Sequence, residues 1–199
     1  DSQNYAIAAT GSDGNFIAID NDGNTVWSYS GSFSNAYGVD IDRDTGDIYV
    51  VGSDASGDML LVRLDTDGNE LDSVTNSTGS ARPRGVAYSE DLQEVAVSMT
   101  GTDRTTNMYS GTGLTFQYSF SRPPAGSAGP VETIEGFWYI SYGGDEISKV
   151  DGTGTEAKTG SSDVHDWEAT RNDTLVVGGF DHLREVDSDL NILTEHSGD

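Results

Sequence analysis

Short apolar runs alternate with polar turns along the entire chain. The segment "FIAIDNDGNTVWSYSG", residues 16–31, is typical, because an apolar run leads into an Asp, a polar turn with Gly and a second alternating run. No segment keeps the 3.6-residue spacing of an amphipathic helix. Alternating runs bounded by Gly, Asn, Asp and Ser indicate β-strands joined by tight turns. The pattern therefore predicts an all-β protein of antiparallel strands.

The polar residue that follows the apolar run recurs at regular positions. It stands at 20, 65, 110, 151 and 187, at intervals of 45, 45, 41 and 36 residues. Such a period fits repeated units of four strands and does not fit helical repeats. The chain divides into five approximate units, 1–31, 32–75, 76–121, 122–160 and 161–199.

The first unit is one strand shorter than the others. Later units begin with a short strand that precedes the main apolar strand, as in "AYGVDIDRDTGDIYVVGS", whereas the chain opens directly on the apolar strand Tyr5–Thr10. An uncovered apolar edge invites another strand. We therefore expect that edge to be covered by a strand from a neighbouring subunit, a rearranged N-terminus or chain beyond Asp199.

Two segments carry a resemblance to known repeat families. "RPRGVAYSEDLQEVAVS" resembles the first two strands of NHL-type propeller repeats, and "FIAIDNDGNTVWSYSG" resembles the hairpin of PQQ-type propellers. The resemblance implies a single five-bladed β-propeller domain over residues 1–199, with four-stranded antiparallel blades and a first blade that is one strand short. It implies a fold and not an activity, because propellers host many functions.

Charge dominates the composition. The formal net charge is −24, from 34 acidic and 10 basic residues. A disordered acidic chain would lack the Val, Ile, Tyr and Trp that are spread evenly here. A calcium-loaded surface protein is an alternative, but the scarcity of Lys resembles proteins of salt-loving archaea, whose acidic surfaces are screened by salt. This charge opposes nucleic acid and anionic lipid, and no apolar run reaches the roughly 18 residues of a membrane span.

Two acidic patterns are candidates for calcium. Asp-x-Asp-Gly, at Asp20 and Asp65, is either a cation loop or a hairpin turn, and its recurrence at one place in the repeat favours the turn. "DIDRDTGD", residues 40–47, alternates three Asp as a calcium loop does, but the equivalent segments of other units keep no such pattern. We predict no metal site. We also predict no cofactor, because the PQQ-type enzymes that the hairpin resembles need more blades than five.

Signals for catalysis are weak. The chain has no Cys and no Gly-x-Ser-x-Gly nucleophile elbow. "VHDWEAT" brings His165, Asp166 and Glu168 together, which is either acid–base chemistry or a hydrogen-bonded turn. We predict that the protein is not an enzyme. The alternative is a glycan-active hydrolase or lyase that uses an Asp/His cluster near the propeller axis.

Surface recognition is the remaining class of function. In propellers the loops that enter the first strand of each blade converge near the axis. Here these loops carry aromatic residues and some of the few positive charges, which are the usual anchors of binding sites. Alternatively, the aromatic residues cap the core. The predicted ligand-binding residues are Tyr37, Arg82, Arg84, Arg122, His165 and Trp167.

The predicted function is a binding or structural module on the exterior of a halophilic archaeon or on the virion of a virus that infects one. A turret, a decoration or a tail-fibre component would fit this composition. The expected partner is a protein or a cell-surface glycan, in a homo-oligomer or a larger assembly. The predicted location is extracellular, at the surface of a cell or a virion.

Overall fold

The computed structural model describes residues 5–77, 81–100, 105–121, 128–142, 146–153, 156–161, 166–169, 174–178 and 182–197. The first sheet contains β1 (Tyr5–Ala9), β2 (Phe16–Asp20) and β3 (Thr25–Tyr29), and the second contains β4 (Asn35–Ile41), β5 (Ile48–Ser53), β6 (Met59–Leu64) and β7 (Glu70–Asn76). The third contains β8 (Arg82–Ser89), β9 (Glu94–Thr100), β10 (Thr105–Ser110) and β11 (Phe116–Ser121). The fourth contains β12 (Ala128–Ile134), β13 (Phe137–Tyr142), β14 (Glu146–Asp151) and β15 (Glu156–Ser161). The fifth contains β16 (Asp166–Ala169), β17 (Leu175–Gly178), β18 (His182–Val186) and β19 (Ile192–Ser197).

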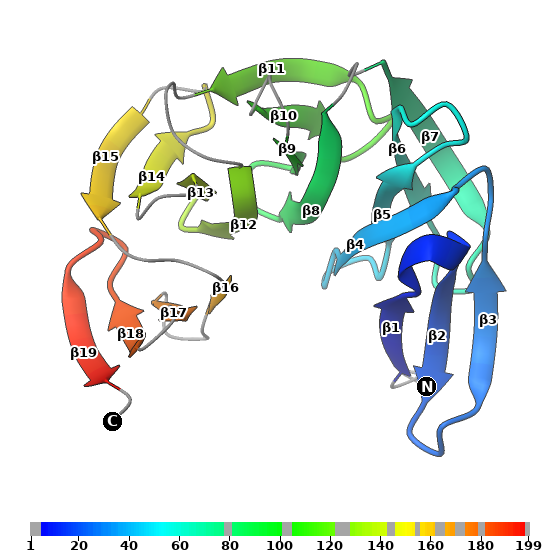
Figure 1. The fold of residues 1–199 in the computed structure, drawn as a ribbon, viewed down its shortest axis with the longest axis horizontal. Helices are drawn as coiled ribbons and strands as arrows, with labels where there is room; N and C mark the ends of the chain where they lie inside the picture. Colours follow the sequence, from blue (N-terminus) through cyan, green and yellow to red (C-terminus); the bar gives the residue numbers. More distant parts are fainter. Residues whose placement is uncertain are drawn as a thin grey trace.

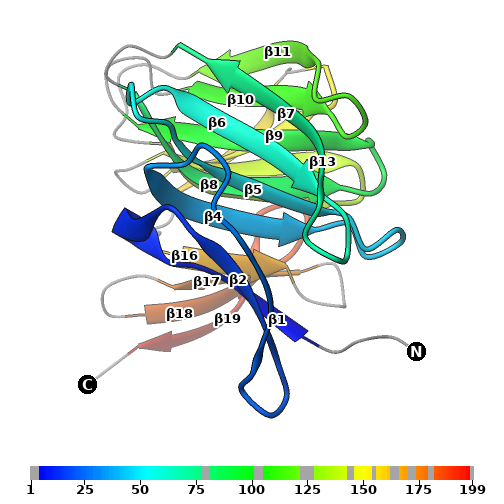
Figure 2. The ribbon, with the colours of Figure 1, turned by 90° about the vertical axis from the view of Figure 1, so that its right-hand side faces the viewer.

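The five sheets follow one another along an arc (Figure 1). Consecutive strands pair antiparallel within each sheet, and a short 3₁₀ helix, η1 (Gly11–Asp13), joins β1 to β2. The inner strands β4, β8, β12 and β16 pack successively against one another. Figure 2 shows the second sheet, β4 to β7, in front of the later sheets. The predicted all-β class and the repeated sheets are confirmed.

The predicted single five-bladed β-propeller is wrong. The structure has five separate sheets, and no strand among the described residues pairs the fifth sheet with the first. The arc is open on the side where both termini lie (Figure 1). A propeller needs its last sheet to join its first, and repeat spacing along the chain does not determine that long-range contact. Closure was implied by the resemblance alone, whereas the residues themselves predict strands, turns and repeated four-stranded units.

The first sheet has three strands, and β1 forms one of its edges. Every described residue of β1 pairs with β2, from Tyr5 opposite Asp20 to Ala9 opposite Phe16. We expected a further strand on the other edge of β1. In the described part of the chain no strand occupies that position.

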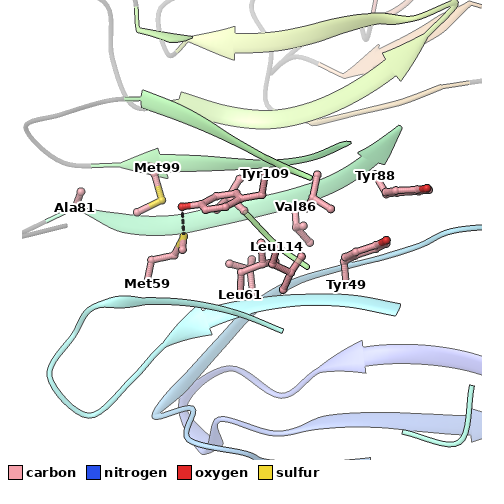
Figure 3. Close-up of a cluster of buried hydrophobic side chains, with 12 residues drawn as sticks. Tyr49, Met59, Leu61, Ala81, Val86, Tyr88, Met99, Tyr109 and Leu114 are labelled. Atoms are coloured by element: carbon pink, nitrogen blue, oxygen red, sulfur yellow. Dashed lines mark hydrogen bonds between the residues drawn. The ribbon is translucent and has the colours of Figure 1, made fainter. Parts of the chain in front are cut away.

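Alternation along the buried strands builds a core between each pair of neighbouring sheets. All of β5 is buried, because its residues alternate between two interfaces. Tyr49 and Val51 pack toward the third sheet, whereas Ile48 and Val50 pack toward the first. Figure 3 shows the first of these interfaces, where Tyr49 and the neighbouring apolar side chains meet residues from β8, β9 and β10.

The Asp-x-Asp-Gly segments are hairpin turns, as predicted. In the turn after β6, Asp65 Oδ1 accepts the backbone N–H groups of Asp67 at 2.9 Å and Asn69 at 2.8 Å. The Asn69 amide donates to Asp65 Oδ2 at 2.9 Å, so both carboxylate oxygens close the turn. The same scheme occurs at Asp20 and Asp187.

Candidate functional site

Two of the predicted binding residues occupy equivalent irregularities in neighbouring inner strands. The register of β4 against β5 shifts between Ala36 and Gly38, and that of β8 against β9 shifts between Pro83 and Gly85. The extra residues are Tyr37 and Arg84. A β-bulge bends its strand and changes the direction of a side chain, which is why bulges recur beside binding sites. The strand β12 has a similar shift.

Glycine lets these two inner strands approach closely beside the bulges. A Cβ atom built on Gly38 would lie 3.2 Å from the Gly85 Cα atom and 3.2 Å from the Val86 amide nitrogen. A side chain there would require the neighbouring backbone to move by a few tenths of an ångström, so Gly suits the close approach of the strands at this position. Since Tyr37 and Arg84 each precede one of these glycines, the structure brings them to neighbouring positions on adjacent strands.

The positive charges at this end of β8 are accessible. Arg82 and Arg84 are exposed, the intervening Pro83 is buried, and Tyr37 is half-buried. Three other cations, Arg63, Lys149 and Arg184, are each in an ion pair with a carboxylate. Arg82 and Arg84 form no ion pair within the described ranges. Two arginines without an ion pair in the described structure therefore lie on β8, and one of them, Arg84, occupies a bulge equivalent to that of Tyr37 on the neighbouring inner strand.

The other predicted binding residues are not brought into this group by the described residues. Trp167 lies in β16, where its backbone is opposite Val177, and β16 is the inner strand of the fifth sheet (Figure 1). Arg122 and His165 lie outside the described residues. The structure thus supports a smaller candidate site of Tyr37, Arg82 and Arg84.

The second calcium candidate is a hydrogen-bonded link between sheets. Asp40 Oδ2 accepts the backbone N–H of Tyr88 at 2.6 Å, which joins β4 to β8. Asp42 is buried, and it accepts the Asp44 amide at 2.9 Å and the Thr45 hydroxyl at 2.7 Å. Burial acts to raise the pKa of Asp42, but hydrogen bonds from Thr45, Asp44 and Tyr88 outweigh it and hold the pKa below its usual value. Among the described residues no cluster of His, Asp and Glu could hold a metal ion.

Sequence reasoning missed the aromatic partner of this link. The Tyr49 and Tyr88 rings stack with their centroids 4.8 Å apart, and burial together with Asp42 raises the pKa of Tyr88 to about 12. Both tyrosines therefore stay neutral near pH 7. Their only sequence signal is a Tyr on each of two strands predicted to be buried.

The described residues of the catalytic alternative lie on different strands of the fifth sheet. Asp166 and Glu168 lie on β16, whereas His182 and His196 lie on β18 and β19, at the far side of the same sheet. Two strand spacings separate the backbones of β16 and β18 by roughly 10 Å. His165, the residue next to Asp166, lies outside the described residues.

A groove on the outer side of the second and third sheets was not predicted. Its volume is about 420 Å³, and it is lined by Val74, Thr75, Asn76, Tyr109 and Phe116. The Phe116 ring is 51% exposed and meets the buried Tyr109 ring edge-on at 5.9 Å. The Asn76 amide donates to the Tyr109 hydroxyl at 3.3 Å. This groove offers an apolar ring but holds no charged side chain.

Comparisons with known proteins inform the fold. No family model matches the chain, and no curated protein matches it. A solved structure, that of a protein of unknown function from Bacteroides caccae, has a TM-score of 0.72 and 13% sequence identity. The match covers 96% of this chain and 77% of that chain. At this identity the similarity shows a shared all-β fold and nothing of activity.

The described residues contain no helix that is long and apolar enough to cross a membrane.

Proposed function

We propose that the protein is a non-enzymatic binding module for an anionic cell-surface glycan, recognised by Tyr37, Arg82 and Arg84. The observation that carries the proposal is a pair of exposed arginines on β8, with no carboxylate partner in the described structure, near the position where the neighbouring inner strand β4 carries Tyr37 in an equivalent bulge. Arg63, Lys149 and Arg184 are paired with carboxylates, whereas the exposed Arg43 stands alone in the described structure without an ion pair; Arg82 and Arg84 differ from it in lying two residues apart on one strand. Leaving two arginines unneutralised at one place favours a ligand that supplies the negative charge.

The side-chain chemistry selects the class of ligand. Guanidinium groups bind carboxylate and sulfate oxygens through paired hydrogen bonds, and a Tyr ring provides a flat apolar surface with a polar edge. A sugar acid presents both kinds of group. The net charge of −24 repels an anion at a distance, but salt of about 1 M reduces the Debye length to roughly 3 Å. Recognition would then depend on the short-range contacts of the site.

The proposal includes a setting in which such salt is present. The protein would act on the exterior of a halophilic archaeon, or on the virion of a virus that infects one, as a turret, decoration or tail-fibre component. The composition, with 34 acidic and 10 basic residues, supports this setting, because acidic surfaces stay soluble where salt screens them.

The test measures binding of the full chain to a polyuronic acid and to a neutral polysaccharide in 2 M NaCl. A double variant, Arg82→Gln with Arg84→Gln, should lose at least about tenfold in affinity for the polyuronic acid, since one charged hydrogen bond contributes about 1.5–3 kcal/mol. Arg43→Gln is the matched control, because Arg43 is also exposed and carries the same charge. Its affinity should be unchanged.

Three results would overturn the proposal. One is an absence of binding to the polyuronic acid, and another is an equal loss in the double variant and in Arg43→Gln. The third is the release of new reducing ends or unsaturated sugars from the polymer, which would favour the hydrolase or lyase instead.

A further inference from the structure

A groove with an exposed aromatic ring lies between the outer strands of the second and third sheets. Its volume is about 420 Å³, and it is lined by Val74, Thr75 and Asn76 of β7, Tyr109 of β10 and Phe116 of β11. The strands β7 and β11 are the outer edges of their sheets, whereas the proposed anionic-glycan site lies on the inner strands β4 and β8 (Figure 1). The groove is therefore a second place on the molecule.

Phe116 gives the groove an apolar wall that solvent reaches. It is 51% exposed, and among the aromatic side chains that the structure describes it is the most exposed. Its ring meets the buried Tyr109 ring edge-on at 5.9 Å, which holds it in place. A fixed and exposed aromatic ring offers a flat apolar surface to a ligand.

Hydrogen bonds fix the orientation of the Asn76 carboxamide in this groove. The buried Tyr109 hydroxyl donates its proton to the Met59 sulfur at 3.7 Å (Figure 3), so its oxygen is left to accept. The Asn76 amide group donates to that oxygen at 3.3 Å. Because the nitrogen of Asn76 faces Tyr109, its carbonyl oxygen is turned away, and within the described residues this oxygen accepts no hydrogen bond. An unused acceptor therefore lines the groove together with the Phe116 ring.

Size and charge of the groove favour a small neutral ligand that has polar groups. No charged side chain lines the groove, and the net charge of −24 repels anions. A stable protein partner uses about 20–30 residues on each side, far more than the five that line this groove. A purely apolar ligand would remove water from Asn76 and Thr75 without replacing the lost hydrogen bonds, which costs free energy.

We propose that this groove binds a neutral sugar, whose pyranose ring packs against Phe116 while one of its hydroxyl groups donates to the Asn76 carbonyl oxygen. A pyranose has C–H bonds on its faces and hydroxyl groups around its rim, so it matches an apolar wall and an unused acceptor at once. The exposed Thr75 hydroxyl, which can donate or accept, serves a second sugar hydroxyl. This neutral-sugar site does not depend on the anionic-glycan site.

The test titrates the full chain in 2 M NaCl, by NMR, with the methyl glycosides of glucose, galactose, mannose and N-acetylglucosamine, and with cyclohexanol as an apolar comparison. At least one glycoside should bind. Phe116→Ala should weaken that binding by at least about tenfold, because it removes the aromatic anchor, and Phe116→Trp should retain it. Asn76→Leu should weaken it by about fivefold, since one hydrogen bond is lost. Leu193→Ala is the matched control and should bind normally, because Leu193 is 54% exposed on the outer strand β19.

The neutral-sugar site is overturned if no glycoside binds, if Phe116→Ala and Leu193→Ala bind alike, or if cyclohexanol binds as tightly as the best glycoside. A dimer in sedimentation that Phe116→Ala dissociates would show that a second copy occupies the groove instead. The Arg82→Gln and Arg84→Gln double variant separates the two sites. It should bind the neutral glycoside normally, whereas Phe116→Ala should bind the polyuronic acid normally. Loss of the neutral glycoside in the double variant would place that sugar on the inner strands and contradict the assignment to the groove.

Discussion

Aspartates of this protein have structural roles that the net charge conceals. Asp65 closes a hairpin with both carboxylate oxygens, Asp40 connects two sheets, and Asp42 is buried among donors. The exposed Asp22 and Asp67 contribute only their backbone amides to the same turns. Acidic residues therefore divide into those that accept internal hydrogen bonds and those that only charge the surface. Substitutions in the two groups should act on stability in opposite directions.

The Asp42 carboxylate should make stability depend on acid pH. Its pKa in the folded protein lies below the usual 3.8, so its contribution is present above that value and is lost as pH falls through the folded pKa. We expect the melting temperature of the natural protein to exceed that of Asp42→Asn near pH 6, and the difference to shrink below about pH 4. Melts of both proteins from pH 2 to 6 in 2 M NaCl measure this difference. A difference independent of pH would show that Asp42 stabilises only by its shape.

The Tyr49 hydroxyl should stabilise the contact between the second and third sheets. It donates to the Gly111 backbone carbonyl at 3.0 Å, and Tyr139 makes the equivalent bond to Ser188 at 2.6 Å between the fourth and fifth sheets. Tyr49→Phe should cost about 1 kcal/mol, because a buried carbonyl loses its donor. Urea unfolding in 2 M NaCl measures the loss. Tyr37→Phe is the control and should be neutral, and equal losses in both variants would contradict the prediction.

At the scale of strands and turns, the sequence predicted the structure well, because the determining interactions are local. Period-two alternation and the turn residues predict a strand such as β1 to within a residue, with Tyr5–Thr10 expected and Tyr5–Ala9 found. The bulges at Tyr37 and Arg84 were not predictable. A bulge depends on how a strand pairs with its neighbour, and here on the close approach of Gly38 to Gly85.

A side chain at position 68, in the turn after β6, should destabilise the protein. Gly68 has a φ of +80°, and a Cβ atom there would lie 2.7 Å from the Trp27 ring of the first sheet. Gly57 has a φ of +86° with no atom within 4 Å of such a Cβ atom. Both Gly→Ala variants should lose about 1–2 kcal/mol from backbone strain. Gly68→Ala should lose more, because it also displaces Trp27.

Thermal or urea unfolding separates these two costs. The difference between Gly68→Ala and Gly57→Ala reports the packing of this turn against Trp27, and a change in the summed tryptophan emission should accompany Gly68→Ala but not Gly57→Ala. Equal losses in the two variants would mean that the first sheet adjusts without cost.

Chelation should leave the hairpin turns unaffected. The carboxylates of Asp20, Asp65 and Asp187 already accept N–H donors, and a bound cation would have to displace them. EDTA in 2 M NaCl should shift the melting temperature by less than about 1 °C. A calcium site adds about 2.7 kcal/mol to the free energy of unfolding when the free calcium concentration is 100 times its dissociation constant. Removing that calcium would lower the melting temperature by at least about 5 °C. A fall of that size, reversed by calcium, would contradict the turn assignment.

At the scale of the whole molecule, the sequence repeats predicted the successive sheets but not whether the fifth sheet joins the first. Each interface between neighbours follows from alternating residues, as with Ile48 and Tyr49 on the two faces of β5. Whether the fifth sheet meets the first depends on residues nearly the full chain apart. The candidate site was predictable only where its residues are close in sequence. Arg82 and Arg84 share one strand, whereas Trp167, which was predicted to join them, belongs to another sheet.

Salt should govern the stability of the whole molecule. With a net charge of −24, the folded state brings like charges together that the unfolded chain keeps apart. Screening relieves this repulsion, because the Debye length falls from about 10 Å at 0.1 M to roughly 3 Å at 1 M. We expect marginal stability in about 0.1 M NaCl and a melting temperature at least about 10 °C higher above 1 M.

A charge-reduced variant distinguishes screening from a general effect of salt on apolar burial. Asp22→Asn, Asp44→Asn and Asp67→Asn together remove three exposed charges whose carboxylates close no turn. If screening is the cause, this variant should melt higher than the natural protein at 0.1 M NaCl, and the two should converge above 1 M. If salt acts on apolar burial instead, the melting temperatures of both proteins should rise equally, and the difference between the two melting temperatures should not change with salt. Melting temperatures that stay flat from 0.1 to 2 M would show that the acidic surface is no adaptation to salt, and the halophilic setting would then lose its support.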